Sequence, residues 1–142
     1  MQTHLPGLVL LATLALFSCR KENMPGRNSA SAFGLETATV MAKGNLQFSD
    51  DKTTGGTAKV YQRKDGSLVL GIEQLTYKSI TSTGVFLSAE PTVNSSAVKV
   101  YSATDYCGDV YVVLAPGLNP AALHWVVFQP TGEPPIATAR LQ

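Results

Sequence analysis

The chain has 142 residues and a mass of 15.1 kDa, which is enough for one domain. It carries 11 basic and 10 acidic residues, and the net charge of +1 excludes a strongly basic protein built to hold nucleic acid. With 2 Cys and 2 His, it is neither a zinc finger, an iron–sulfur protein nor a disulfide-rich mini-protein. The composition leaves a small, nearly neutral globular domain.

The N-terminus carries an uncharged apolar run over residues 8–17. A run of about ten residues is too short to span a bilayer but matches the hydrophobic region of a signal peptide. The run ends in Leu-Phe-Ser-Cys at positions 16–19, which resembles the lipobox of bacterial lipoproteins. The resemblance implies that residues 1–18 are a lipoprotein signal peptide and that Cys19 is acylated. The alternatives are an ordinary secretory peptide and a core segment that happens to end in Cys.

A lipidated Cys19 would make the membrane the first partner of this protein. Acyl chains contribute about 0.8 kcal/mol per buried methylene, so several chains anchor a soluble domain stably. Arg20 rather than Asp follows the Cys, and the resemblance to bacterial lipoproteins then implies the outer membrane as the destination in the cell envelope.

Two regions come after the signal peptide. Residues 19–37 are polar, small and without periodicity, which predicts a flexible tether behind the lipidated cysteine. Residues 38–142 alternate short β-branched and aromatic runs with turn residues. This pattern predicts one all-β domain, a small β-sandwich or partly closed antiparallel barrel of about eight short strands. The expected strands are Thr39–Phe48, Thr57–Arg63, Ser67–Leu75, Val85–Ser88, Ala97–Ser102, Val110–Leu114, His124–Gln129 and Ile136–Leu141.

Local signals add detail to this pattern. Asp65 and Gly66 lie between two expected strands, where Asp-Gly predicts a hairpin with a type I′ turn and positive φ at both positions. Val110–Leu114 and Trp125–Phe128 are apolar at every position. We therefore expect both to be central strands that are buried on both faces.

Cys107 is the first candidate site residue. It is the only thiol left in the mature chain if Cys19 carries lipid, so it is a candidate for a redox or ligand role. Its nearest charged neighbours, Asp105 and Asp109, do not stabilise a thiolate. The other interpretation is a small buried side chain.

His124 is the second candidate, because one His is able to serve as an axial haem ligand. The other interpretation is a strand-edge His without a ligand role. We expect Trp125 to face the opposite side of the strand, so that the two rings form no common binding patch. The mature chain has no readable pairing of nucleophile and base and too few ligands for zinc, so we expect no catalytic residue, no metal and no enzyme.

Several short segments succeed one another through the domain: Gly44–Phe48, Thr54–Tyr61, Asp65–Leu70, Leu75, Gly84–Ser88, Gly108–Pro116, Trp125–Phe128 and Ala139–Leu141. In this order they resemble the DM-thirteen domain, a small β domain proposed to transfer electrons. The resemblance covers most of 42–142 and implies a β fold in an exported protein. Gln129 stands where that family has its signature Cys, so we transfer no catalytic residue from it.

These observations support two hypotheses. The first is a non-enzymatic, lipid-anchored module that binds an envelope protein or a small ligand through loops near 49–56, 77–84 and 115–122. The alternative is an electron-transfer module of the DM-thirteen kind that uses Cys107 or a bound prosthetic group such as haem. We expect no nucleic acid partner under either hypothesis. A hydrolase is the weakest interpretation, because no nucleophile–base pair is readable.

Overall fold

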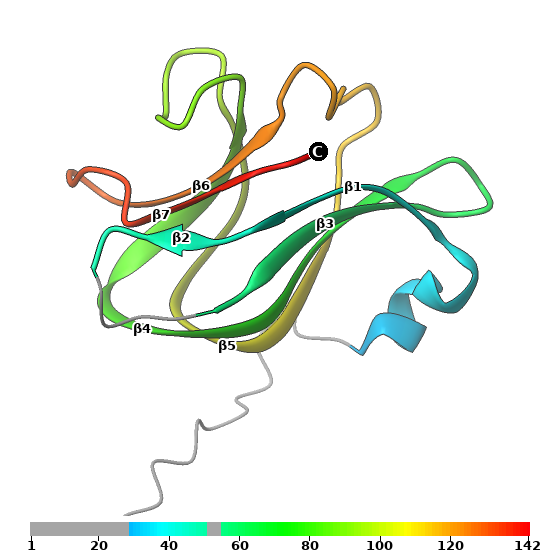
Figure 1. Cartoon of the computed structure of the whole chain (residues 1–142), viewed down its shortest axis with the longest axis horizontal. Helices are drawn as coiled ribbons and strands as arrows, with labels where there is room; N and C mark the ends of the chain where they lie inside the picture. The colour runs from blue at the N-terminus through cyan, green and yellow to red at the C-terminus, as the bar shows by residue number, and fades with distance from the viewer. Residues whose placement is uncertain (1–28, 51–54) are drawn as a thin grey trace, which may run out of the picture.

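The computed structural model describes residues 29–50 and 55–142, with the backbone alone for 76–81 and 103–107. The predicted signal peptide, Cys19 and most of the predicted tether lie outside the described residues. Two 3-10 turns, η1 (Ala30–Phe33) and η2 (Leu35–Thr37), precede the strands. The strands are β1 (Thr39–Asn45), β2 (Gln47–Phe48), β3 (Thr57–Gln62), β4 (Leu68–Ser88), β5 (Val98–Val113), β6 (Trp125–Pro130) and β7 (Ala137–Arg140) (Figure 1).

The strands form two antiparallel sheets of four and five strands, and the prediction of a small all-β sandwich is confirmed. The long hairpin of β4 and β5 belongs to both sheets. The first half of β4 pairs with β3 and with the end of β5, which gives sheet I in the order β1-β3-β4-β5. The second half of β4 pairs with β6 and with the start of β5, which gives sheet II in the order β2-β7-β6-β4-β5.

The predicted strand ends within the β4–β5 hairpin were wrong. The expected strands 67–75 and 85–88 are parts of β4, and 97–102 and 110–114 fall largely within β5. The pairing register shifts between Ile72 and Leu75 and again between Lys78 and Thr83. Such bulges bend a strand without ending it. The expected loop at 77–84 is therefore part of a strand, and the hairpin bends from one layer into the other (Figure 1).

Backbone conformation marks the first of these bends. Gln74 has a φ of 55°, in the left-handed region that a non-glycine residue rarely adopts. The carboxylate Oδ1 of Asp109 accepts a hydrogen bond from the Gln74 N–H at 2.9 Å. Gly108, next to Asp109 on the partner strand, has a φ of 80°. The Asp109 side chain thus satisfies a backbone donor at the bulge.

The far edges of the two sheets are joined by one continuous stretch of chain. Only Leu46 separates β1, which pairs with β3, from β2, which pairs with β7. Lys43 and Gln142 exchange backbone hydrogen bonds, each with an N···O distance of 3.0 Å. Because β1 crosses to β7 in this way, the sandwich is also partly closed as a barrel.

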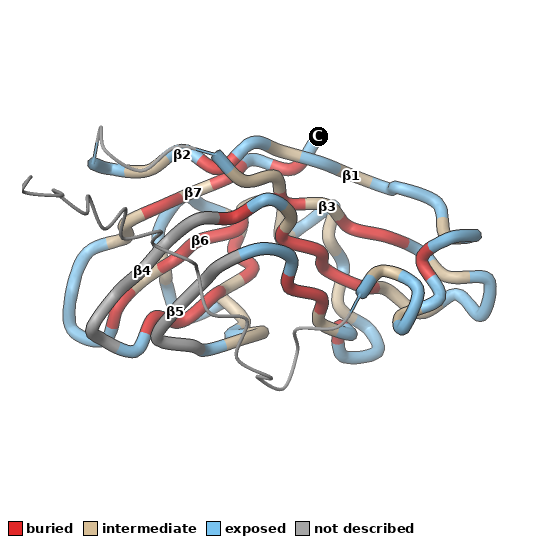
Figure 2. Tube along the Cα trace, turned by 90° about the horizontal axis from the view of Figure 1, so that it is seen from below, coloured by how far each residue is buried: buried red, intermediate tan, exposed pale blue. Residues whose placement is uncertain are grey.

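The core lies between the two sheets. Its largest fully buried side chains include Phe128, Leu70, Leu75 and Leu87. Figure 2 shows the buried segments in the strands and most of the exposed segments in the turns and loops. Apolar burial of this kind is the main stabilising term for a small domain, at about 25 cal/mol per Å² of apolar surface.

The two strands expected to be central differ in outcome. Val126 to Phe128 of β6 are fully buried between β4 and β7, as expected. The segment from Val110 to Val113 belongs to β5, which pairs only with β4, and Val113 is 48% exposed. Its apolar character has another cause: the outer face at Tyr111 is covered by the N-terminal turns, so an edge strand is buried on two sides there.

The covering segment is η1 and η2, which fall within the predicted tether. Leu35 is only 7% exposed and packs against Tyr61, Val69 and Tyr111 on the outer face of sheet I. The rings of Phe33 and Tyr111 lie 5.8 Å apart between centroids. The tether prediction was therefore wrong for these turns, because an amphipathic 3-10 segment is too short to show periodicity. No helix in the described part of the chain is long and apolar enough to cross a membrane.

The hairpin predicted at Asp65 and Gly66 is present, but its turn type is different. Gly66 has a φ of 83°, whereas Asp65 is not among the described residues with positive φ. The N–H of Gly66 donates to the carbonyl of Arg63, and the N–H of Arg63 to that of Ser67, both at 2.9 Å. This pattern is a turn with a glycine bulge after it, and the Asp65 carboxylate stabilises it by accepting from the Ser67 N–H at 2.9 Å.

Candidate functional site

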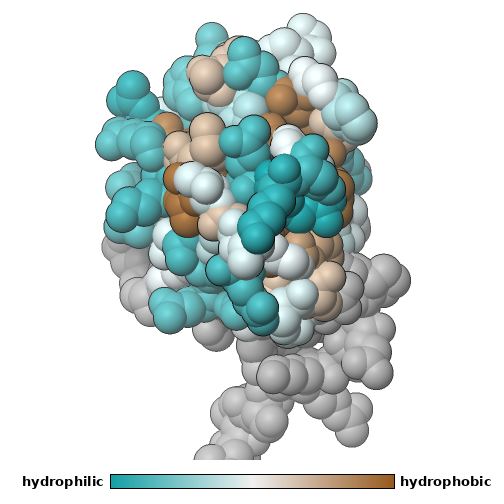
Figure 3. All heavy atoms as spheres, turned by 90° about the vertical axis from the view of Figure 1, so that its right-hand side faces the viewer, coloured by the Kyte–Doolittle hydropathy of each residue, from teal (hydrophilic) through white to brown (hydrophobic). Residues whose placement is uncertain are grey.

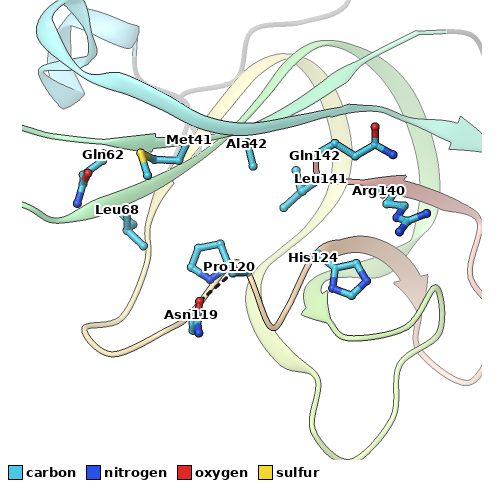
Figure 4. Close-up of a pocket in the computed structure, with 11 residues that line it drawn as sticks. Met41, Ala42, Gln62, Leu68, Asn119, Pro120, His124, Arg140, Leu141 and Gln142 are labelled. Atoms are coloured by element: carbon cyan, nitrogen blue, oxygen red, sulfur yellow. Dashed lines mark hydrogen bonds between the residues drawn. The ribbon is translucent and has the colours of Figure 1, made fainter.

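A pocket of about 550 Å³ opens at the end of the sandwich that carries the β3–β4 turn. We call it the end pocket. Its walls come from β1, the facing ends of β3 and β4, the β5–β6 loop (residues 114–124), the end of β7 and the two residues after it (Figure 4). Figure 3, which faces this end of the molecule, shows hydrophobic side chains in separate patches among hydrophilic ones.

The β5–β6 loop owes its shape to Asn119. Its side-chain Oδ1 accepts a hydrogen bond from the Ala121 N–H at 3.0 Å. Its carbonyl accepts from the N–H groups of Ala122 and Leu123 at 3.1 and 3.0 Å. Asn is suited to this role because its short side chain bonds to backbone two residues on. The predicted binding loop at 115–122 thus lines a pocket, and the one at 49–56 lies partly outside the described residues.

The end pocket is apolar along one wall and polar at one end. Met41, which is 55% exposed, and Leu68 lie toward one end in Figure 4, with the polar side chain of Gln62 near them. His124 and Arg140 lie toward the other, with Leu141 beside them. An apolar wall with a few polar groups at a fixed position is the usual composition of a small-molecule site.

His124, one of the two predicted candidates, is half-buried in this pocket. Its carbonyl accepts a hydrogen bond from the Leu141 N–H at 2.8 Å, which fixes the residue just before β6. Its ring centroid is 6.4 Å from that of Trp125, closer than strand alternation predicts, because His124 precedes the strand. Trp125 nevertheless lines a different cavity.

Cys107, the other candidate, lies in β5 and is paired with Thr76 of β4. Its side chain lies outside the described residues, as does the whole of Cys19. Among the residues that are described, no group of three or more His, Cys, Asp or Glu side chains is placed to hold a metal ion. The end pocket brings His124 together with residues from both ends of the domain.

The sequence gives almost no indication that the other residues of the pocket lie near His124. Met41, Arg140 and Gln142 come from opposite ends of the domain and meet only because β1 crosses to β7. The one usable sign is the outward position of Arg140 in the alternating run of β7, where Ala137 and Ala139 are buried.

A second polar group of interest lies on the outer face of sheet I, around Glu73. Lys59 Nζ is 2.5 Å from its Oε2, and the side chain of Glu73 is only 17% exposed. The hydroxyls of Tyr61 and Tyr111 both donate to its Oε1, the latter at 3.3 Å. Gly71 leaves room for both rings: a Cβ there would lie 2.9 Å from the ring of Tyr111 and 3.0 Å from that of Tyr61.

These contacts shift the pKa values of three groups. Burial acts to raise the pKa of Glu73, but hydrogen bonds from Lys59 and Tyr61 outweigh it, and the pKa lies below its ordinary value. Burial and the Glu73 carboxylate together raise the pKa of the Tyr61 hydroxyl far above its ordinary value. The same two causes raise the pKa of Tyr111. Glu73 is therefore charged in the folded protein and both tyrosines are protonated donors.

Comparisons with protein families, with curated proteins and with solved structures found no match for this chain. The resemblance to the DM-thirteen domain stays a prediction, as does the electron-transfer role that it implies.

Proposed function

We propose that this chain is a lipid-anchored, non-enzymatic binding module of the cell envelope, and that the end pocket is its ligand site. The observation that carries the proposal is the division of the pocket into an apolar wall at Met41 and Leu68 and a polar end at His124 and Arg140. This division suits a small ligand with an apolar body and one anionic group. The pocket volume, about 550 Å³, lies within the range of small-molecule sites.

The lining supports binding rather than reaction. Its described residues include one titratable base, His124, and no hydroxyl, thiol or carboxylate side chain that could act as a nucleophile. Arg140 is a fixed cation and is suited to hold a carboxylate in place. The lipid at Cys19, which is the predicted anchor, would hold the domain at the membrane surface.

Ala121→Phe is expected to block the end pocket. Ala121 is exposed and lines the pocket, and its backbone bond to Asn119 does not depend on the side chain. The full chain in a non-ionic detergent is titrated with adamantane carboxylate, a rigid apolar anion. Fluorescence of Trp125, the only Trp, reports binding because its ring lies next to His124. We expect at least about tenfold weaker binding by the variant, because a filled pocket excludes the ligand.

Ala122→Phe is the matched control, since Ala122 is equally exposed in the same loop and does not line the pocket. It should bind like the unmodified chain. The neutral amide of the same ligand should bind about tenfold more weakly, because it loses the charge that faces Arg140. Equal binding by both Phe variants, or no binding by the unmodified chain, would remove the end pocket as the ligand site.

The anchor is tested separately by labelling host cells with an alkyne analogue of palmitate. The unmodified chain should carry the label and Cys19→Ala should carry none, because the thiol and the new N-terminus at Cys19 are the acceptors that the lipobox implies. Cys107→Ala is the control and should label normally. Label retained in Cys19→Ala, or lost in Cys107→Ala, would contradict the assignment of the anchor.

A further inference from the structure

A second cavity, of about 720 Å³, lies across the seam where β1 meets β7. We call it the seam groove. Its lining is mostly polar, and the lining side chains come from β1, β2, β3, β6, β7 and Gln142, which follows β7 by two residues. Four neighbouring strands, β3, β1, β7 and β6, cross it, which corresponds to a width of about 14 Å at the usual spacing between strands. A groove of this size suits an extended ligand.

Three cations line the seam groove: Lys43, Lys59 and Arg140. Lys43 and Lys59 are direct cross-strand partners, an arrangement of like charges that destabilises a sheet unless it is compensated. Lys59 is compensated by Glu73 at 2.5 Å. No acidic side chain among the described residues lies within ion-pair distance of Lys43 or Arg140, and none of the described lining residues has an acidic side chain.

The remaining groups of the groove suit a polyhydroxylated ligand. The side-chain amides of Asn45 and Gln47 both donate and accept hydrogen bonds, as sugar hydroxyls do. Thr57 and Thr138 add two hydroxyls. Trp125 is half-buried and contributes the only aromatic side chain of the described lining. In an acidic sugar chain, the indole matches the apolar face of a sugar ring, the amides match the hydroxyls, and the cations match the acid groups.

We propose that the seam groove binds an acidic oligosaccharide, a sugar chain that carries carboxylate or phosphate groups. Lys43 and Arg140 pair with the acid groups, Trp125 contacts a sugar ring, and the amides hold its hydroxyls. This site is distinct from the end pocket in chemistry and ligand. Arg140 lines both cavities, so the groove is tested at Lys43 instead.

The test is isothermal titration of the full chain with oligogalacturonate. The chain is held in a polyoxyethylene detergent, because sugar-headed detergents would compete. Lys43→Glu is expected to weaken binding at least about tenfold, since it removes one charge-assisted contact and adds a repulsive charge. Lys43 is exposed, so the variant should fold. Lys64→Glu changes the same charge in the exposed β3–β4 turn, away from the groove, and should bind normally.

Three other probes define the ligand class: a neutral galactose oligomer, inorganic phosphate, and vesicles of phosphatidylglycerol in phosphatidylcholine. We expect each to bind at least about tenfold more weakly than oligogalacturonate, because each lacks either the acid groups or the sugar chain. The proposal is overturned if oligogalacturonate does not bind, if Lys43→Glu and Lys64→Glu bind it equally, or if any of these probes matches it. Because the end-pocket test uses another ligand and other variants, the two proposals fail independently.

Discussion

Gly44→Ala is expected to lower the free energy of unfolding by about 3 kcal/mol or more. A Cβ at this position would lie 2.1 Å from the carbonyl oxygen of Arg140 and 2.8 Å from its carbonyl carbon. Both atoms belong to the backbone, so no side-chain rotation relieves the clash. The seam would have to open, which would break the paired hydrogen bonds between Lys43 and Gln142.

Gly66→Ala is the control. The free energy of unfolding of both variants is measured by urea unfolding. Gly66 has a φ of 83° with nothing within 4 Å of the site of a Cβ, so its substitution costs only backbone strain, about 1–2 kcal/mol. Gly44 is not among the positive-φ glycines. An argument from φ alone would therefore rank the two substitutions in the opposite order. If Gly44→Ala proves the milder change, the close crossing of β1 over β7 is wrong.

Gly44 also shows how far sequence reasoning reaches in this fold. A glycine inside a strand pattern indicates a close backbone approach, so the feature itself is visible in the sequence. Its partner, Arg140, is not visible, because the contact depends on β1 running into β2 and crossing to the far sheet. The alternation of side chains is a local property of the sequence, so it predicts strands well, whereas contacts between distant strands are not local.

The strand breaks show the opposite case. The sequence prediction ended a strand at Leu75 and placed a loop at 77–84, whereas β4 continues through this stretch and bends at bulges. Whether a stretch is a loop or a bent strand depends on its pairing with β5, which is a tertiary contact. The prediction that 110–114 is a central strand failed for a similar reason. Its apolar residues are explained by a tertiary contact, because η1 and η2 cover the outer face at Tyr111.

The two cavities depend even more on topology. A net charge of +1 predicts no basic surface, yet three cations gather in the seam groove. No sequence pattern groups the three cations Lys43, Lys59 and Arg140. They become neighbours because their strands lie side by side in the fold. Net charge limits the long-range field of a protein, but it does not limit local clusters.

Glu73→Gln is expected to lower the free energy of unfolding by about 1–3 kcal/mol at pH 7, because the amide cannot accept the charge-assisted bond from Lys59. The loss should depend on pH. Since the pKa of Glu73 is lowered on folding, its ionised form adds stability above its ordinary pKa of 4.5, and this contribution disappears as the pH falls below that value. The difference between the two proteins should therefore narrow in acid.

Urea unfolding at pH 7 and at several values below 4.5 measures this difference. Glu90→Gln is the matched control, because Glu90 is exposed and has no described ion-pair partner, so it should behave like the unmodified chain at every pH. If the difference in free energy of unfolding between Glu73→Gln and the unmodified chain stays constant with pH, the shape of the Glu73 side chain, and not its charge, stabilises the fold. A narrowing difference would show that the carboxylate compensates Lys59, which leaves Lys43 as the uncompensated cation of the like-charged pair in the seam groove.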